Sequence, residues 1–284
     1  MNLPLVSVNI PTYNSQDTLE MCLAKVTEQT YSNIEVIVID SYSHDLTVNI
    51  AVNYNAKVVF ARGLLRQRLK GIRESNGDYI LLLDSDQWLE PDVVEKCIQK
   101  CRTSEYNALI LFEKSIVGNQ TRTGRLAAYN MDVVQQDADV IWGTALPRFF
   151  KANILKAINP PRREVGYFDH AFLYLKAIEA GAKVSYVDAL VHHYERNTFY
   201  SIITKFYRGY GMYFIPAFQE DPRLVIGKAL PKRAYVSGRL LKQPDLLAGL
   251  FFLYTLKAGA AGAGVVAYLL KRIVKSPKTD GDLT

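Results

Sequence analysis

Two carboxylates separated by one residue, Asp84 and Asp86, directly follow the short apolar run 79–83 (YILLL). A run of this kind is typical of a parallel strand covered on both faces, and ligands of parallel sheets bind beyond the carboxyl ends of the strands. Two carboxylates at that edge can turn towards one ligand, most often Mg²⁺ or Mn²⁺ bridging them to a diphosphate. An acidic turn exposed to solvent is the alternative, and the position after the strand favours the metal.

A third carboxylate, Asp40, ends a second apolar run, residues 34–39 (IEVIVI). At a strand end it is placed to accept hydrogen bonds from a nucleobase or a ribose. It could equally serve as a helix cap or a turn residue. We favour the ligand role because several strand ends converge at the same edge.

The elements that must position these residues alternate along the chain. Apolar β-branched runs predict strands at 5–11, 34–39, 57–60, 79–83 and 108–112, and helical spacing predicts helices at 15–29, 48–54, 63–75 and from Pro91 onward. Strands that alternate with amphipathic helices form βαβ units, so the sequence predicts an α/β, Rossmann-like fold with a mostly parallel sheet.

Several short motifs share the order typical of one enzyme family: Pro11-Thr12-Tyr13-Asn14, Asp40, Arg66-Gln67-Arg68 with Gly71, Asn76-Gly77-Asp78-Tyr79 and Asp84-Ser85-Asp86. This ordered set resembles the family 2 inverting glycosyltransferases, which have the GT-A fold, over about residues 3–210. The resemblance implies that the Pro11–Asn14 motif, Asp40 and Arg66 bind the nucleotide, and that Asp84 and Asp86 act around the metal and the sugar diphosphate. One departure is Asp40-Ser41-Tyr42, where the family often has paired acidic residues.

The second half is expected to supply the acceptor side. Trp142-Gly143-Thr144-Ala145 and Arg148-Phe149-Phe150 resemble the acceptor loop of the family. Asp169, in Gly166-Tyr167-Phe168-Asp169-His170, matches its general base, although Phe168 replaces a Glu. An inverting transfer needs one carboxylate to take the proton of the acceptor hydroxyl. Capping the following helix is the alternative role for Asp169.

Two further motifs resemble donor-binding elements of the family. His192-His193 follows the strand predicted at 183–187, and one of the two, with His193 slightly favoured, is expected at the metal or the diphosphate. Arg208, in Lys205-Phe206-Tyr207-Arg208-Gly209, can clamp a diphosphate or face lipid headgroups. Processive members have a Trp where Gly209 stands, so synthesis of a long polymer is not expected.

Composition restricts the remaining function classes. With 49% hydrophobic and 22% charged residues the chain is globular. Three cysteines give no disulfide framework, and nothing at the N-terminus resembles a signal peptide, so we expect a cytoplasmic catalytic domain. Cys97 and Cys101, one turn apart, are expected in the core. Residues 223–284 carry 11 Lys and Arg against 3 Asp and Glu, and this positive charge favours binding to anionic lipids. The first 222 residues contain no patch of basic residues interleaved with aromatic ones, so nucleic-acid binding is not expected.

The C-terminal part is expected to contact a membrane. We predict a GT-A domain at 1–198, amphipathic interfacial helices at 199–245, a membrane-embedded or spanning segment at 246–274 and a disordered end at 275–284. Lys257 and the Gly-rich stretch 259–264 interrupt the apolar segment, so it is either a single span or two short helices bent there. Basic residues on both sides favour the bent form, with both ends cytoplasmic.

The leading hypothesis is therefore a membrane-bound, Mg²⁺- or Mn²⁺-dependent transferase. It would move a hexose from a nucleoside-diphosphate sugar, with GDP-mannose favoured and a UDP-sugar possible, to a polyprenyl-linked glycan. The resemblance extends to small membrane-attached members such as the mannosyltransferases of lipid-linked oligosaccharide assembly. A polyprenyl-phosphate sugar synthase, with Arg162-Arg163 at a basic acceptor mouth, is the close alternative. A nucleotidyltransferase would need a Gly-rich N-terminal loop, and a degenerate binding module is suggested only by Phe168.

Overall fold

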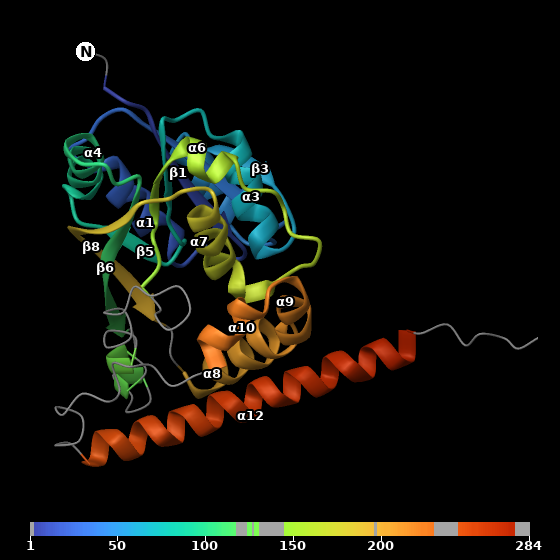
Figure 1. Cartoon of the computed structure of the whole chain (residues 1–284). Coiled ribbons are helices and arrows are strands. Elements are labelled where there is room, and N and C mark those ends of the chain that lie inside the picture. Colours follow the sequence, from blue (N-terminus) through green and yellow to red (C-terminus); the bar gives the residue numbers. More distant parts are fainter. Residues whose placement is uncertain are drawn as a thin grey trace, which may run out of the picture.

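The computed structural model describes residues 3–117, 124–126, 128–130, 145–195, 198–229 and 244–275. They form a sheet in the order β3-β2-β1-β4-β7-β6-β8-β5 (Figure 1). The strands are β1 (Val6–Thr12), β2 (Ile34–Asp40), β3 (Lys57–Phe60), β4 (Tyr79–Leu82), β5 (Gln87–Leu89), β6 (Ala108–Val117), β7 (Phe149–Lys151) and β8 (Val184–Glu195). The pairs among β1 to β4 and the β6–β8 pair are parallel, which confirms the predicted α/β fold class.

Helices cover both faces of this sheet. They are α1 (Leu19–Thr27), α2 (Thr47–Asn53), α3 (Leu64–Glu74), α4 (Val93–Thr103), α6 (Ala152–Lys156), the 3₁₀ turn η1 (Gly166–Phe168) and α7 (Asp169–Glu179). Side chains of β4 alternate between two cores, because Leu81 packs with α1 and α4 while Ile80 and Leu82 pack with α3 and α7. This two-sided burial explains why residues 79–83 are continuously apolar. Cys97 and Cys101 are free and buried in the core, as predicted.

Two short strands and one long extension were not predicted. β5 and β7 have three residues each and pair antiparallel with β8 and with β4 and β6. β8 continues well beyond the predicted end at residue 187, so the expectation that His192 and His193 follow the strand is wrong. The strand continues because β6 and β5 supply partners for its backbone groups, which local sequence does not reveal.

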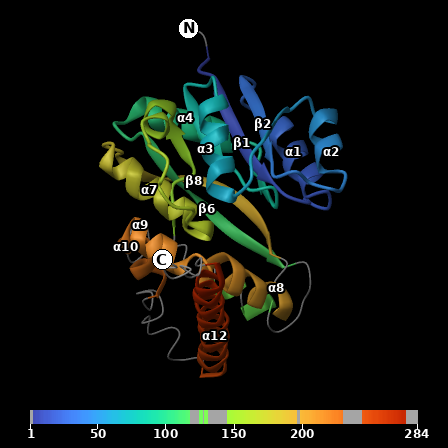
Figure 2. The ribbon, with the colours of Figure 1, turned by 90° about the vertical axis from the view of Figure 1, so that its right-hand side faces the viewer.

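The C-terminal part consists of α8 (Phe199–Thr204), the π-helix η2 (Lys205–Gly211), α9 (Phe214–Glu220), α10 (Pro222–Ala229) and α12 (Pro244–Lys275). Figures 1 and 2 show α12 running beneath α8, α9 and α10, on the side away from the sheet. Its 27-residue portion Leu247–Ile273 is long and apolar enough to cross a membrane, by length and composition alone.

The predicted bend of the C-terminal segment at Lys257 to Gly264 is wrong, because α12 is one helix of 32 residues. One of its glycines, Gly264, packs closely against η2. A Cβ at Gly264 would lie 2.2 Å from the carbonyl oxygen of Tyr207, and one at Gly211 would lie 2.3 Å from that of Ala261. The two glycines therefore let the backbones of α12 and η2 touch.

Candidate active site

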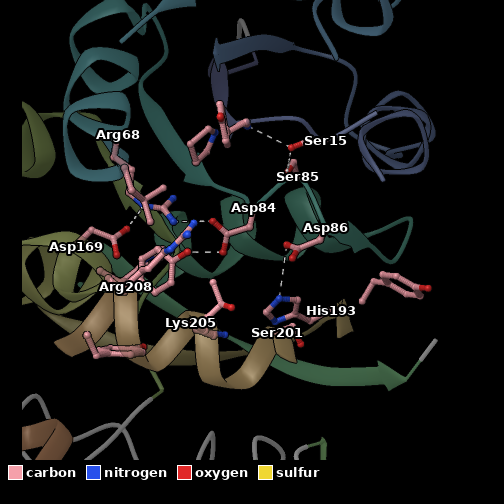
Figure 3. A pocket seen from close by; sticks show the side chains of 18 of the residues that line it. Ser15, Arg68, Asp84, Ser85, Asp86, Asp169, His193, Ser201, Lys205 and Arg208 are labelled. Atoms are coloured by element: carbon pink, nitrogen blue, oxygen red, sulfur yellow. Dashed lines mark hydrogen bonds and ion pairs between the residues drawn. The ribbon is translucent and has the colours of Figure 1, made fainter. Parts of the chain in front are cut away.

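A pocket of about 760 Å³ lies at the carboxyl ends of β1 and β4 and is closed on its other side by α8 and η2 (Figure 3). Most of the residues that the sequence marked for chemistry line it. The lining includes Pro11, Tyr13, Arg68, Asp84, Asp86, Glu113, Arg148, Asp169, His170, His193, Lys205 and Arg208. The pocket therefore carries many charges, and its carboxylates and guanidinium groups form direct ion pairs.

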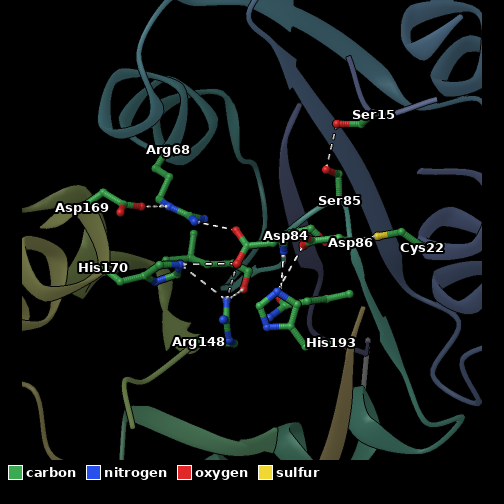
Figure 4. A network of polar contacts seen from close by, with 12 residues as sticks. Ser15, Cys22, Arg68, Asp84, Ser85, Asp86, Arg148, Asp169, His170 and His193 are labelled. Carbon is green, nitrogen blue, oxygen red and sulfur yellow. Dashed lines mark hydrogen bonds and ion pairs between the residues drawn. The ribbon is translucent and has the colours of Figure 1, made fainter. Parts of the chain in front are cut away.

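Arg68 joins two of the predicted carboxylates. Its Nε donates to Asp169 and its Nη2 donates to Asp84 at 2.6 Å (Figure 4). The Arg68 side chain is only 2% exposed, and that of Asp169 only 4%. Asp169 begins α7 whereas Asp84 follows β4, so one guanidinium fixes two distant segments in a fork geometry that lysine cannot reproduce.

The third nitrogen of this guanidinium, Nη1 of Arg68, is buried and has no hydrogen-bond partner among the described residues. A buried donor left unsatisfied is costly, and Arg68 lines the pocket. An anionic ligand in the pocket would supply the missing acceptor. The two flanking carboxylates raise the pKa of Arg68 against the effect of burial, so it remains charged.

A second chain of ionic contacts starts from the same Asp84. Arg148 donates through Nε to Glu113 and through Nη1 to Asp84 at 3.3 Å. Burial raises the pKa of Asp84, but Arg68 and Arg148 together hold it well below the usual range. Burial also opposes ionisation of Glu113, yet Arg148 and His193 bring its pKa to about 2. Both carboxylates are therefore ionised at neutral pH.

His193 connects this chain to Asp86. Its Nε2 lies 3.6 Å from Oδ1 of Asp86, and its Nδ1 lies 3.5 Å from Oε2 of Glu113. The neighbouring His192 contacts Glu90 instead. Alternation along β8 sends the two imidazoles to opposite faces of the sheet, so only His193 lines the pocket.

Two of the three predicted ligands, Asp86 and His193, are placed to hold a divalent cation of the Mg²⁺ or Mn²⁺ type. No cluster of three His, Cys, Asp or Glu suited to a metal occurs within the described parts of the chain. Of the predicted ligands Asp84, Asp86 and His193, Asp84 pairs with two arginines in this structure. Asp86 and His193 still face each other, and such cations commonly take one or two protein ligands and complete their octahedron with phosphate oxygens and water.

The predicted nucleoside-binding residues divide into two groups. Pro11 and Tyr13 line the pocket. Asp40 is fully buried and accepts hydrogen bonds from Thr12 Oγ1 at 2.9 Å and from the backbone and hydroxyl of Ser43. Asp40 and Thr12 thus fix the two loops that follow β1 and β2.

Asn14 and Tyr42 lie on these same two loops. The backbone N–H of Asn14 donates to Ser43 at 2.8 Å, and its side-chain oxygen accepts from His44 at 3.0 Å. Tyr42 stacks on Phe60 and lies beneath the guanidinium of Arg62, 4.9 Å from its ring centroid. These contacts set the shape of the surface beside Tyr13.

Arg66, which was expected at the donor, lies outside the pocket lining. Its side chain is 72% exposed and pairs with Glu164 at 3.4 Å. Residues two apart on a helix point to nearly opposite sides, so when the apolar side chains of α3 face the core, Arg68 rather than Arg66 faces the site. Gln67, between them, donates to the backbone of Thr12 and Ile39 and anchors α3 to β1 and β2.

Asp169 and Phe168 have distinct structural environments. The N-cap position of α7 is Phe168, and no side chain caps the helix, so the capping alternative for Asp169 is not realised. Phe168 is 1% exposed and packs edge-on against Tyr210 of η2, with ring centroids 5.3 Å apart. The residue that departs from the family pattern therefore holds η2 against the turn that carries Asp169.

Lys205 and Arg208 project from η2 into the pocket, both with exposed side chains. The position of η2 is set by close contact at Gly209, where a Cβ would lie 2.1 Å from the ring of Tyr167. This contact gives a physical reason for the absence of the Trp found in processive members, because no side chain fits there.

We expect Gly209→Ala to lower the free energy of unfolding by about 1–3 kcal/mol, the usual cost of overpacking. The added methyl group would force Tyr167 or η2 to move. Thermal unfolding of the purified chain measures the effect. Gly259→Ala is the matched control, because a Cβ there meets nothing within 4 Å. Equal melting temperatures for the two variants would contradict the close packing of η1 and η2.

Arg68, Glu113 and Arg148 belong to the site but were not predicted as site residues. Arg68 and Arg148 belong to the motifs Arg66-Gln67-Arg68 and Arg148-Phe149-Phe150. The sequence did not show whether Arg66 or Arg68 faces the site. Glu113 directly follows the apolar run 108–112, the same strand-end signal that singled out Asp40 and Asp84. In the predicted acceptor loop, Trp142, Gly143 and Thr144 lie outside the described residues, whereas Ala145 is buried.

Comparison with known proteins identifies the family. The family model Glycosyl transferase family 2 matches residues 7–164, more than half of the chain. The chain is 27% identical over 216 residues to EpsH of Bacillus subtilis, a protein named as a glycosyltransferase. The match covers 68% of this chain and 61% of EpsH. The poly(ribitol-phosphate) beta-glucosyltransferase of Bacillus spizizenii is 27% identical over 197 residues, covering 64% of this chain and 31% of its own length. The chain thus spans less than two thirds of either relative.

Solved structures show the same fold at low sequence identity. The mannosyltransferase PcManGT of Pyrobaculum calidifontis, in complex with GDP-Man and Mn²⁺, has a TM-score of 0.58 at 18% identity, covering 99% of this chain and 89% of that one. S. aureus TarS 1-349, in complex with UDP-GlcNAc, has a TM-score of 0.57 at 14% identity, covering 95% and 92%. Together with the ordered motifs and the pocket they line, the family match shows that the chain belongs to glycosyl transferase family 2.

Proposed function

We propose that this chain is a membrane-associated inverting glycosyltransferase that moves a hexose from a nucleoside-diphosphate sugar to a lipid-linked saccharide. The observation that carries the proposal is the Asp169–Arg68–Asp84 bridge in the wall of a pocket that also receives two cations from η2. It places the buried carboxylate of Asp169 near the positive charges of the pocket. Direct displacement needs such a carboxylate for the acceptor proton and such charges for the departing diphosphate.

In this proposal Asp169 takes the proton of the acceptor hydroxyl while that oxygen attacks the anomeric carbon. The ion pair with Arg68 keeps its carboxylate oriented. Lys205, Arg208 and the unpartnered Nη1 of Arg68 donate to the diphosphate. A divalent cation, held by Asp86 and His193, would neutralise charge on the departing phosphate.

GDP-mannose is the favoured donor, and a UDP-sugar is the alternative. Support comes from fold neighbours that bind GDP-Man with Mn²⁺ in one case and UDP-GlcNAc in another. The apolar portion of α12 supports a membrane location and hence a polyprenyl-linked glycan as acceptor. We propose that the catalytic domain faces the cytoplasm, as the absence of a disulfide framework suggests.

The alternative of a polyprenyl-phosphate sugar synthase predicted a basic acceptor mouth at Arg162 and Arg163. Their backbone N–H groups instead donate to Glu220. Arg162 lines a different pocket, together with Lys176, Glu179 and Glu220, and does not line the pocket that contains Asp84 and Asp169. We therefore keep the saccharide acceptor.

Binding of the donor is expected to raise the melting temperature of the purified chain, and the rise should require Mn²⁺. A ligand at 100 times its Kd stabilises the native state by about 2.7 kcal/mol. The panel is GDP, UDP, GDP-mannose, UDP-glucose and UDP-N-acetylglucosamine, each with and without Mn²⁺. Asp86→Ala is expected to remove the Mn²⁺-dependent part of the shift. If no nucleotide shifts the transition, the donor site is wrongly placed.

A further inference from the structure

The outer face of α12 is apolar and exposed along its whole length. Phe251 is 75% exposed and Ile273 is 71% exposed. Further large exposed apolar side chains of the helix recur at helical spacing on the same side: Leu247, Phe252, Val266, Leu269 and Leu270. A stripe of this length is larger than soluble proteins usually leave in contact with water, so it marks an interaction surface.

The opposite face of α12 packs against the protein and contains the charge that interrupts the apolar sequence. Leu250 and Leu253 are buried, and Gly264 touches η2. Nζ of Lys257 lies 5.1 Å from the ring centroid of Phe206, so this cation turns towards η2 rather than outward. Lys271 and Arg272 are exposed and lie near the C-terminal end of the helix, where they can bind anionic lipid headgroups.

This packing is incompatible with α12 crossing a bilayer. Its apolar portion, 27 residues or about 40 Å long, would have its midpoint near the bilayer centre. The midpoint is where Ala261 and Gly264 touch η2, and η2 carries Lys205 and Arg208. Spanning would therefore draw the polar pocket into hydrocarbon, where each charge is expensive. A helix that lies flat, with its outer face in one leaflet, keeps the pocket at the water boundary.

An apolar groove of about 440 Å³ lies between α8 and α12. It is lined by Ile203, Phe252, Thr255, Leu256, Gly259 and Ala260. Phe252 belongs both to the groove and to the exposed outer face, so the groove would open to the leaflet in which α12 lies. Gly259 leaves room there, because a Cβ at this position meets nothing within 4 Å.

Helix α8 contributes residues to both the groove and the polar pocket. Ser201 and Thr204 line the pocket, and Ile203 lines the groove. The cations Lys205 and Arg208 follow α8 directly and face the pocket (Figure 3). A lipid-linked saccharide therefore fits with its saccharide in the polar pocket and its hydrocarbon chain over α8.

We propose that α12 lies flat in one membrane leaflet and that the groove between α8 and α12 binds the hydrocarbon chain of the lipid-linked acceptor. The inference rests on the proposed function for the identity of the acceptor. It adds a binding site outside the catalytic pocket and a single orientation of the catalytic domain relative to the membrane.

Photolabelling tests the groove. The full chain is incubated with phosphatidylcholine vesicles that contain a diazirine-bearing polyprenyl phosphate, and the labelled peptides are identified by mass spectrometry. We expect labels at Ile203 and Phe252, displaced by unlabelled polyprenyl phosphate and not by phosphatidylglycerol. Gly259→Leu, which fills the groove, should reduce this labelling about tenfold, the effect of displacing one buried apolar group.

Gly262→Leu is the matched control, because Gly262 lies on the same helix, outside the groove, and an added Cβ also meets nothing within 4 Å. It should label like the parent chain. Equal displacement by phosphatidylglycerol, or equal loss in both variants, would show only general lipid contact and would overturn the groove. The nucleotide-induced thermal shift of Gly259→Leu should stay unchanged, which separates failure of the groove from failure of the donor site.

Cysteine labelling tests the flat orientation. Cys22, Cys97 and Cys101 are buried, so single cysteines placed at Asp245 and at Arg272, near the two ends of α12, can be followed with an impermeant maleimide. In sealed inverted membrane vesicles both positions should react, because both ends of a flat helix face the same compartment. Reaction at one end and protection of the other until detergent is added would show a span and overturn the proposal.

Discussion

Replacing Asp169 by asparagine is expected to lower kcat for sugar transfer by about 10²–10⁴-fold, the usual contribution of a general base. The amide retains the size of the side chain but cannot accept the proton of the acceptor hydroxyl. Arg68 keeps its contact with Asp84 in this variant, so the wall of the pocket should persist. The measurement is release of the nucleoside diphosphate from the donor in the presence of acceptor.

The discriminating result is a loss of kcat with the donor-induced thermal shift preserved. Asp92→Asn, an exposed aspartate before α4 that pairs with Lys96, is the control and should retain full turnover. Near-normal turnover of Asp169→Asn would remove Asp169 from the role of base. Loss of both turnover and the thermal shift would mean that Asp169 acts mainly through the position of Arg68.

Replacing Arg68 by alanine is expected to lower the free energy of unfolding by about 3 kcal/mol, near the lower end of values for breaking a buried ion pair. The loss would leave the carboxylate of Asp169 buried without its counter-ion. The carboxylate of Asp84 would be destabilised less, because it is 25% exposed and keeps its ion pair with Arg148. Thermal or urea unfolding measures the effect, and donor binding should weaken in the same variant.

Arg66→Ala provides a matched control on the same helix, because Arg66 is exposed and pairs only with Glu164 among the contacts described. Its stability should change by less than about 0.5 kcal/mol. Arg68→Lys keeps the charge without the fork, so it should recover part of the stability and little of the transfer rate. Equal stabilities for Arg68→Ala and Arg66→Ala would contradict the structural importance of the bridge.

Much of the fold could be predicted from local patterns. The apolar run that ends at Asp40 is a strand between two parallel neighbours, and the run before Asp84 is a strand between parallel β1 and antiparallel β7. Burial on both faces leaves a continuous apolar signature in the sequence. The strand-end rule also brought Asp84 and Asp86 to one pocket. Family resemblance added Asp169, whose position next to Asp84 depends on segments 85 residues apart in the sequence.

The remaining features depend on contacts that no local window contains. β5 and β7 are three residues long and exist because longer strands pair with them. The helical phase of α3, which decides between Arg66 and Arg68, follows from how Leu65, Leu69 and Ile72 pack in the core. The glycines near Lys257 suggested a bend, whereas the helix continues through them and Gly264 provides a close contact with η2.

The sequence alone determined the α/β fold class, the strand ends that carry Asp40, Asp84 and Asp86, and the apolar segment that forms α12, because each depends on residues adjacent in the chain. The tertiary structure decided which ionic partners meet. It turned Asp84 to two arginines, left Asp86 with His193, and directed Lys257 inward. Such choices depend on the balance between desolvation of a charge and its pairing, which is fixed only when distant elements pack together.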